Sequence, residues 1–512
     1  MKALFVLVVG LGAPGILPSL AVARRSPVLV FLAPLAGAGM VAVAAEIELG
    51  VGGSLVADYA VVAVAANLAV TAWWLAARRS LRPWAGPSWG WSIVTVVVVL
   101  AAAAVPLDAL RVPMIGGDGN SIWLTHALMV YGGHHELLTD LQNVAYRFSN
   151  PDYPLLAPAA GALAFAFFGL GNLHLAVDMT VLLSACGLGV VGTGIAVAAS
   201  GGSQGGRPSQ GGSGGMGPSR KRSQQSGGRQ PTRAAAVAAA GAICVVGFAV
   251  SGVFEIQGYA DLLWAVAAVG AVIWGLVLPQ SAQALGVAWI CAVVASLTKN
   301  EGLTTAIAIL VLIALRYRPL TRPVLAARRW AERAAFVAVP ALPGLAWAGL
   351  VRLIGLHDAF FRATSPESPV TRAGATVAGM AAHLAVAPVD LAVLLVGCWF
   401  LRRDRERARL GNPAWLWAAW LGSLAILFAT YMIGGPEIHG WLTASVNRTT
   451  IFAQVLLYAD LAIWLVIAVD GAFTRADSEQ RDVGQSAASV ASNPRRTETL
   501  TPNVDKLRTR DR

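Results

Sequence analysis

Lys299 is the most unusual residue of this sequence, because it lies with Asn300, Glu301 and Gly302 between two apolar runs. The other lysines of the chain lie at its start, in a polar segment and in its tail. Charged side chains at a membrane boundary are unfavourable unless they are paired or hydrated, so they are functional candidates. The alternative is that Lys299 anchors a helix end by extending its ammonium group to the interface. We expect Lys299 and Glu301 to belong to a functional site.

Four more segments place acidic or basic residues beside apolar runs. Near neutral pH a carboxylate can accept a proton from a hydroxyl group as a general base. Arginine can hold a phosphate through two hydrogen bonds and lysine as a point charge, which stabilises a phosphate leaving group. We interpret these segments, together with Lys299 and its neighbours, as one composite site at the mouth of a helix bundle. The segments are 111–172, 255–261, 357–372 and 437–450.

A simpler explanation of these polar residues is that they lie in loops exposed to water. This explains Glu367 and Arg372 well. It explains Asp261 and Lys299 poorly, because both lie at the ends of apolar spans.

The adjacent residues His134, His135 and Glu136 raise the question of a metal site. Neighbouring positions on a helix point in different directions, and no zinc-type spacing follows them. We therefore expect no metal at these residues.

The composition is that of a polytopic membrane protein. Of the 512 residues, 56% are hydrophobic and only 13% are charged, and the mean hydropathy is +0.63. The net charge of +11 comes from basic residues in short segments between apolar runs, which indicates membrane topology and not nucleic-acid binding. The apolar runs predict an all-α transmembrane helix bundle of about 13 spans. They are expected at residues 3–22, 27–45, 57–77, 91–110, 173–198, 234–253, 260–278, 282–298, 303–316, 334–354, 384–401, 414–433 and 451–470.

The basic segments predict the orientation of the chain. By the positive-inside rule their side is cytoplasmic, so the N-terminus is outside, the C-terminus is inside and 111–172 is a large extracytoplasmic loop. The run from Leu155 to Leu170 is short, and we interpret it as an interfacial or re-entrant helix. The expected parts are additional N-terminal helices at 1–89, the first part of the core at 90–198, a disordered Gly/Ser/Arg-rich cytoplasmic linker at 199–233, the remaining core at 234–472 and a disordered cytoplasmic tail at 473–512.

Five short motifs follow one another between about residues 90 and 450. The motifs are Gly-Asp-Gly-Asn-Ser-Ile-Trp at 117–123, Asp-Tyr-Pro-Leu-Leu at 152–156, Gly-Tyr-Ala-Asp at 258–261, Thr-Lys-x-x-Gly at 298–302 and Trp-Leu-x-x-Ser-x-x-Arg at 441–448. On these motifs the chain resembles the GT-C superfamily of polytopic glycosyltransferases. It is most similar to the bacterial relatives of protein O-mannosyltransferases and lipid A aminoarabinose transferases.

The chain departs from the pattern of this superfamily in three ways. The common Asp-Glu pair is Asp118-Gly119 here, and the His-Pro-Pro-Leu element has lost its histidine and one proline. Three additional spans are expected before the helix that would be first in the core. These departures bear on which substrate the resemblance implies more than on which fold it implies.

The resemblance implies an enzyme of the bacterial cell membrane. It would move a sugar from a polyprenyl-phosphate donor to a cell-envelope acceptor hydroxyl at the outer face, with inversion and with no cofactor, metal or nucleic acid. In that scheme Asp118 is the general base, with Asp152 as an alternative base or as its orienting partner. Lys299 and Arg448 bind the donor phosphate. The implied substrate-binding residues are Trp123, Tyr153, Tyr259, Asp261, Glu301 and Ser445.

Two other classes of protein share this composition. A transporter or flippase of a lipid-linked sugar or another amphiphile places ionisable residues near the bilayer midplane and builds broken helices in repeated halves. A membrane scaffold needs no polar motifs at all. In this sequence the ionisable residues gather at helix ends and in one large loop, which favours an enzyme.

Overall fold

The computed structural model describes about three fifths of the chain. The described residues are 1–23, 26, 28–77, 115, 117–200, 258–278, 281–316, 326–356, 367–386, 414–433 and 437–463. The predicted spans at 91–110 and 234–253 lie outside them, as do most of the span at 384–401, the linker from residue 201 and the tail at 473–512.

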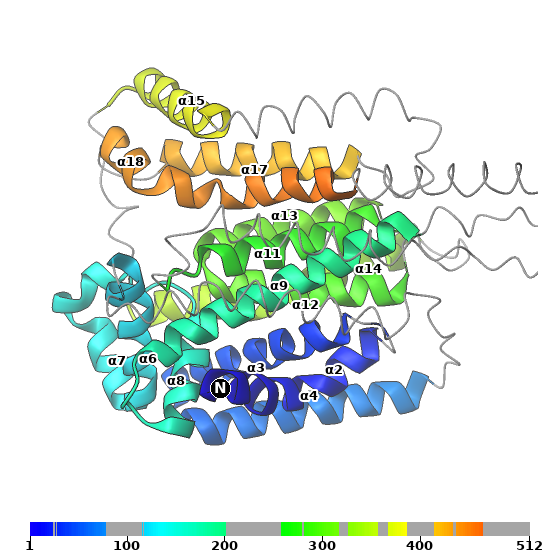
Figure 1. Ribbon diagram of the computed structural model, residues 1–512, viewed down its shortest axis with the longest axis vertical. Coiled ribbons are helices and arrows are strands. Elements are labelled where there is room, and N and C mark those ends of the chain that lie inside the picture. The colour runs from blue at the N-terminus through cyan, green and yellow to red at the C-terminus, as the bar shows by residue number, and fades with distance from the viewer. Residues whose placement is uncertain are drawn as a thin grey trace, which may run out of the picture. The chain divides into compact units, whose positions relative to one another are not determined.

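All regular elements of the described residues are helices, which confirms the all-α class (Figure 1). Six of them are long and apolar enough to cross a membrane, so the chain is a membrane protein. The total of about 13 spans stays a prediction. The six candidate spans are Lys2–Ala23, Leu29–Val51, Leu55–Trp73, His174–Ala198, Arg333–Leu353 and Trp415–Ile433, and shorter apolar helices lie at Leu156–Phe168, Asp261–Val277 and Ala282–Thr298.

The N-terminal helices surround α3 (Leu29–Val51), which is buried along most of its length. This helix runs past the predicted end of its span at residue 45, so Glu46 and Glu48 belong to it. In the sequence these two acidic residues mark the end of the apolar run. They do not end the helix, because both side chains are buried against neighbouring elements. The other N-terminal elements are α1 (Lys2–Phe5), the π-helical η1 (Val6–Gly12), α2 (Ala13–Ala23) and α4 (Leu55–Ala77).

The segment predicted as a large loop at 111–172 is mostly helical where it is described. Its last helix, α8 (Leu156–Phe168), is buried from Leu156 to Phe165 against α3, α6 and α9. A helix lying on the membrane surface would expose one face, so this burial favours the re-entrant over the interfacial interpretation of the run, which stays a prediction. The preceding elements are the π-helical η2 (Gly119–Leu124), α6 (Thr125–Gly132), α7 (His134–Gln142) and the 3-10 helix η3 (Val144–Ser149).

The central helices pack around α11, which is fully buried. α11 (Asp261–Val272) is buried at every residue and packs against α9 (His174–Ser200), α12 (Ala282–Thr298) and α13 (Asn300–Arg316). The π-helical η5 (Ile273–Val277) continues α11, and α14 (Ala326–Leu353) packs on α12 and α13. The start of α11 carries Asp261, and Lys299 lies at the junction of α12 and α13.

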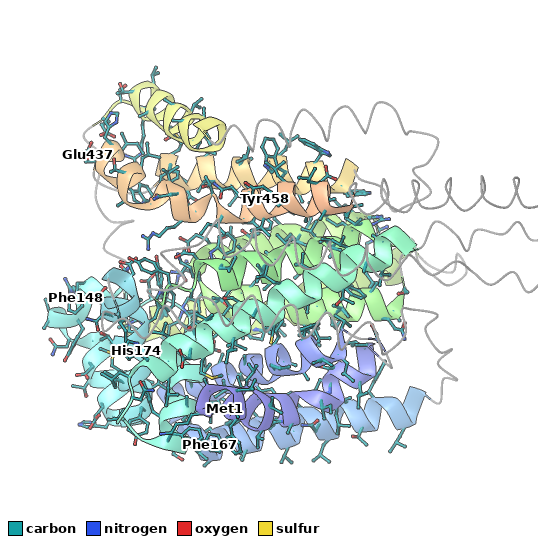
Figure 2. All side chains as sticks on the ribbon, in the orientation of Figure 1. Met1, Phe148, Phe167, His174, Glu437 and Tyr458 are labelled. Atoms are coloured by element: carbon teal, nitrogen blue, oxygen red, sulfur yellow. The ribbon has the colours of Figure 1, made fainter. Side chains whose placement is uncertain are left out.

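The C-terminal described helices form a neighbouring group. α15 (Pro369–Val386) packs on both α17 (Ala414–Ile433) and α18 (Ile438–Thr449), and α17 also contacts α13. Glu437 begins α18, as Figure 2 shows, and its carboxylate accepts the backbone N–H groups of His439 and Gly440. This N-cap satisfies two of the free N–H groups of the first turn.

Candidate functional site

The predicted site residues come from separate parts of the chain, and most of them lie around two ion pairs. They lie at 117–123, just before α8, at the start of α11, at the junction of α12 and α13, and near the end of α18. Two ion pairs form the centre of this arrangement, one partly exposed and one buried.

The partly exposed ion pair joins Asp118 to Arg448. The Nη1 group of Arg448 donates to Oδ2 of Asp118. The Arg448 side chain is 18% exposed and the Asp118 side chain is 33% exposed. The guanidinium carbon of Arg448 also lies 5.1 Å from the centre of the Tyr259 ring, which is a cation–π distance. The sequence predicted these three residues for one site but gave them different roles.

Tyr259 also holds the backbone of Asp118. The N–H group of Asp118 donates to the Tyr259 hydroxyl at 3.1 Å. The hydroxyl approaches so closely that a Cβ atom on Gly117 would lie 2.2 Å from it, and Gly117 has a φ of +48°. Only glycine avoids both the strain and the clash. The two glycines around Asp118 in the sequence were a visible sign of this close approach.

The buried ion pair joins Lys299 to Asp261. Nζ of Lys299 lies 2.8 Å from Oδ1 of Asp261, and the side chains are only 4% and 1% exposed. Lys299 is the single residue between α12 and α13, and Asp261 is the first residue of α11. A cation at a helix C-terminus and an acid at a helix N-terminus are both favoured by the helix dipoles.

The carboxylates around the two cations keep both of them charged. Burial by itself lowers the pKa of Lys299, but Asp261 and Glu301 outweigh it and raise the pKa above its ordinary value. Burial likewise opposes the charge of Arg448, and Asp261 and Asp118 together raise its pKa. Glu301 lies 3.8 Å from Nζ of Lys299, in the first turn of α13.

Gly302 explains the last position of the Thr-Lys-x-x-Gly motif. A Cβ atom on it would lie 1.9 Å from the backbone oxygen of Ala295 in α12. The glycine therefore lets α13 turn back closely against α12 directly after Lys299. The predicted turn at 299–302 is shorter than expected, because α13 already begins at Asn300.

Two aromatic residues line the buried side of the pair. The rings of Trp123 and Tyr153 stack with their centres 5.6 Å apart, and Nζ of Lys299 lies 5.5 Å from the centre of the Tyr153 ring. Trp123 is buried in an apolar cluster with Ile122 and Ala260. In this structure Trp123 therefore packs in the core and supports Tyr153.

Asp152 is held by residues that the sequence did not single out for this purpose. Its Oδ2 atom accepts a hydrogen bond of 2.7 Å from the side-chain amide of Asn300. Its backbone oxygen accepts a hydrogen bond of 2.7 Å from the indole N–H of Trp347. Asn300 could have been found, since it lies inside the Lys299 motif. Trp347 could not, because it lies in an apolar run without a polar neighbour nearby.

Ser445 contacts another helix rather than the two ion pairs. Its hydroxyl lies 2.8 Å from the hydroxyl of Tyr431 in α17, and that hydroxyl also lies 3.0 Å from the Thr449 hydroxyl. These contacts join α17 to the part of α18 that carries Arg448. These contacts indicate that Ser445 positions α18.

Arg372 is buried, so its interpretation as a residue of a wet loop is wrong. The side chain is 3% exposed, and its Nε group donates to the backbone oxygen of Tyr431 at 2.6 Å. Its Nη1 group lies 3.2 Å from Glu367, and Glu367 accepts the N–H group of Ile438 at the start of α18. Sequence reasoning missed this connection, because a buried paired arginine and an exposed one look alike in a sequence.

The other polar residues named from the sequence lie away from this contact set or outside the described residues. Glu255 and His357 belong to the latter. Nδ1 of His134 lies 2.6 Å from the backbone oxygen of Glu48. Across the described residues, no group of three or more His, Cys, Asp or Glu side chains has a geometry that could hold a metal ion.

A small recess adjoins the Asp118 segment. It has room for no more than about one water molecule, and its walls are mostly apolar. One side comes from η2 and the start of α8, and the other from α9 and the residue before Tyr259. The lining residues are Gly119, Trp123, Leu124, Ala157, Ala176, Val177, Thr180 and Gly258.

The arrangement combines a partly exposed carboxylate, a partly exposed guanidinium and an apolar recess next to them. A carboxylate of this kind can accept a proton, and the guanidinium can bind an anion. The sequence matches no protein-family model, no curated protein and no solved structure. What the protein does is therefore argued from these residues.

Proposed function

We propose that this membrane protein is a glycosyltransferase that moves a sugar from a polyprenyl-phosphate donor to an acceptor hydroxyl at the outer face of the membrane. The observation that carries the proposal is the Asp118–Arg448 pair beside an apolar recess. A lipid-linked phosphate sugar presents three chemical parts, namely an anion, a polar sugar and an apolar chain. The site offers a cation, carboxylates and an apolar surface next to one another.

In the proposed reaction Asp118 accepts the proton of the acceptor hydroxyl. The acceptor oxygen then forms a bond to the anomeric carbon, while the bond from that carbon to the phosphate oxygen breaks. The electron pair of the broken bond stays on the phosphate, which leaves as polyprenyl phosphate. Attack from the side opposite the phosphate inverts the anomeric configuration. No further reactant is needed for this balance.

Arg448 is the better candidate of the two cations for direct contact with the phosphate. Its guanidinium is partly exposed and has donors beyond the one that binds Asp118. Lys299 is buried and already bound to Asp261. We assign Lys299 to a supporting role, in which its fixed positive charge favours the anion from behind the Tyr153 ring.

The experiment uses purified protein in lipid nanodiscs with polyprenyl-phosphate sugars and envelope acceptors, both extracted from its own cells. Mass spectrometry follows the release of polyprenyl phosphate and the transfer of sugar. We expect Asp118→Asn to lower the rate by about 10²- to 10⁴-fold, as is typical for loss of a general base. Glu136→Gln is the matched control, since Glu136 is an exposed acid on α7. Donor turnover that is absent in the wild type, or equal in Asp118→Asn, would refute the proposal.

One observation favours the second candidate, a transporter or flippase. Glu46 and Glu48 are buried within α3, a candidate membrane span, and Oε1 of Glu46 has no hydrogen-bond partner among the described residues. Ionisable groups inside spans often mark transport pathways. Proteoliposomes with a fluorescent lipid-linked sugar test this function. Flipping that is lost in Glu46→Gln, with no sugar transfer by the wild type, would favour the transporter.

A further inference from the structure

Tyr431 lies in the last turn of α17, and its hydroxyl group joins that helix to α18 (Figure 1). The residue is 1% exposed, so a substrate has almost no surface of it to contact. Its hydroxyl lies 2.8 Å from the Ser445 hydroxyl and 3.0 Å from the Thr449 hydroxyl. The Ser445 hydroxyl donates its own hydrogen to the backbone oxygen of Trp441, so Tyr431 is the donor in the first contact. Its oxygen can then accept from Thr449.

The second half of α18 has little apolar packing of its own. The buried apolar residues of this helix are Ile438 and Leu442, both in its first half. In the second half, which carries Arg448, the buried residue is Ser445, and Val446 is only partly buried. How the second half is turned about the helix axis therefore depends on polar contacts at its side.

Arg448 lies next to these polar contacts. It follows Ser445 by three positions and precedes Thr449, and residues three apart are neighbours on a helix surface. From there its side chain reaches Asp118 and the Tyr259 ring, which belong to other parts of the chain. Because the guanidinium stands at the end of a long side chain, a small rotation of α18 moves it farther than it moves the backbone. Displacing a group of the site by about 1 Å can cost on the order of 10²-fold in rate.

The Tyr431 side chain is itself fixed by two further contacts. Its ring packs edge-on against the Trp441 ring, with 4.8 Å between the centres. Its backbone oxygen accepts a hydrogen bond of 2.6 Å from Nε of Arg372. Neither contact uses the hydroxyl group. Tyr431→Phe therefore removes the hydroxyl and keeps both of the other contacts.

We propose that Tyr431 is a positioning residue for Arg448, which it holds in place for the donor phosphate through the hydroxyl groups of Ser445 and Thr449. This inference rests on the glycosyltransferase function proposed above, in which Arg448 binds that phosphate. Tyr431 touches neither the donor nor the acceptor. Its contribution is to keep the guanidinium where the phosphate binds, so that less order has to be created on binding.

The test is a double-mutant cycle on the binding of decaprenyl phosphate to the full-length protein in nanodiscs of uncharged lipid. Arg448→Gln should bind at least about tenfold more weakly than wild type. Tyr431→Phe should bind about two- to tenfold more weakly, which is the range for one lost hydrogen bond. In the Arg448→Gln background Tyr431→Phe should cause no further loss, because the side chain that it positions is gone. Unfolded protein lowers the number of binding sites but not the affinity of the remaining ones, so the dissociation constant separates positioning from folding.

Tyr59→Phe is the matched control. Tyr59 is a buried tyrosine of α4 whose hydroxyl donates to the backbone oxygen of Gly10 at 2.7 Å. This contact lies among the N-terminal helices, so its loss should lower stability and leave the affinity for decaprenyl phosphate unchanged. Thr449→Val is a second variant, which removes one hydroxyl partner without altering Tyr431. It should weaken binding by about twofold or more in the wild-type background and not in the Arg448→Gln background.

The outcomes separate the positioning role from the proposed function. If the wild type does not bind decaprenyl phosphate, the glycosyltransferase function is refuted and the inference with it. If Arg448→Gln weakens binding but Tyr431→Phe and Thr449→Val bind like wild type, only the positioning role is refuted. An equal loss from Tyr431→Phe in both backgrounds would also overturn the role, because Tyr431 would then act independently of Arg448. Weaker binding by Tyr59→Phe would overturn it too, since any lost buried contact would then lower the affinity.

Discussion

Replacing Lys299 by methionine should strongly destabilise the protein. The Lys299 ammonium group lies 2.8 Å from Asp261, and the two side chains are 4% and 1% exposed. The substitution leaves a buried carboxylate whose Oδ2 atom already has no hydrogen-bond partner among the described residues. Leaving one charge of a buried pair without compensation costs about 3–5 kcal/mol. We expect Lys299→Met to lower the free energy of unfolding by this amount.

Removal of both charges separates pairing from packing. In the double variant Lys299→Met/Asp261→Leu neither charge remains, and buried pairs replaced by apolar residues of similar volume are often nearly neutral. The double variant should therefore be more stable than Lys299→Met by about 2 kcal/mol or more. Lys2→Met is the matched control, because Lys2 is an exposed lysine at the start of the chain.

Steric trapping in bicelles measures these free energies of unfolding without detergent denaturation. The reasoning would be refuted if Lys299→Met were as stable as Lys2→Met. That result would show that Lys299 is a hydrated lysine at a helix end. It would also be refuted if the double variant were less stable than each single variant, because the pairing would then be irrelevant. Decaprenyl phosphate binding by the folded double variant would further show that Lys299 does not contact the phosphate.

Three other predictions concern the same network. Tyr259→Phe removes the hydroxyl that accepts the Asp118 N–H group, so we expect a rate loss of about five- to tenfold with little change in donor affinity, measured by sugar transfer. Arg372→Met leaves the half-buried Glu367 and the backbone oxygen of Tyr431 without this cation and should lower the free energy of unfolding by about 1–3 kcal/mol, whereas Arg372→Lys should recover part of that loss. The pKa of Lys299 is raised in the folded state above its ordinary value of 10.5. The charged Lys299 therefore stabilises the folded protein fully at any pH below 10.5, and this stabilisation is lost only as the pH rises toward the pKa of the folded state. The difference in stability between wild type and the double variant should therefore stay constant from about pH 7 to 10, and a decrease within that range would contradict the pairing.

Most of the described helices follow from the apolar runs. The run at 173–198 predicted α9 (His174–Ser200) closely, because a long apolar run has only a helix to satisfy its backbone in a membrane. The end of α3 was missed, since Glu46 and Glu48 are acids that lie inside the helix. Burial against other helices, which the sequence does not display, decided that boundary.

The members of the site were easier to predict than their relationships. Asp261 and Lys299 stood out because charged residues rarely end apolar runs, and they form an ion pair. The contact between Asp118 and Arg448 joins residues 330 positions apart, and no local sequence pattern predicts it. Arg372 was misread for a similar reason, because the backbone oxygen that its Nε group binds belongs to Tyr431 in another helix.

The most direct test of the central claim is an analysis of lipid-linked sugars in cells that lack this protein. If the protein uses a polyprenyl-phosphate sugar as its donor, that donor should accumulate, and one glycan residue of the envelope should be missing. The wild-type gene should reverse both changes, and a gene carrying Asp118→Asn should reverse neither. A pool of polyprenyl-phosphate sugars and a glycan composition that both remain unchanged in the deletion strain would contradict the account.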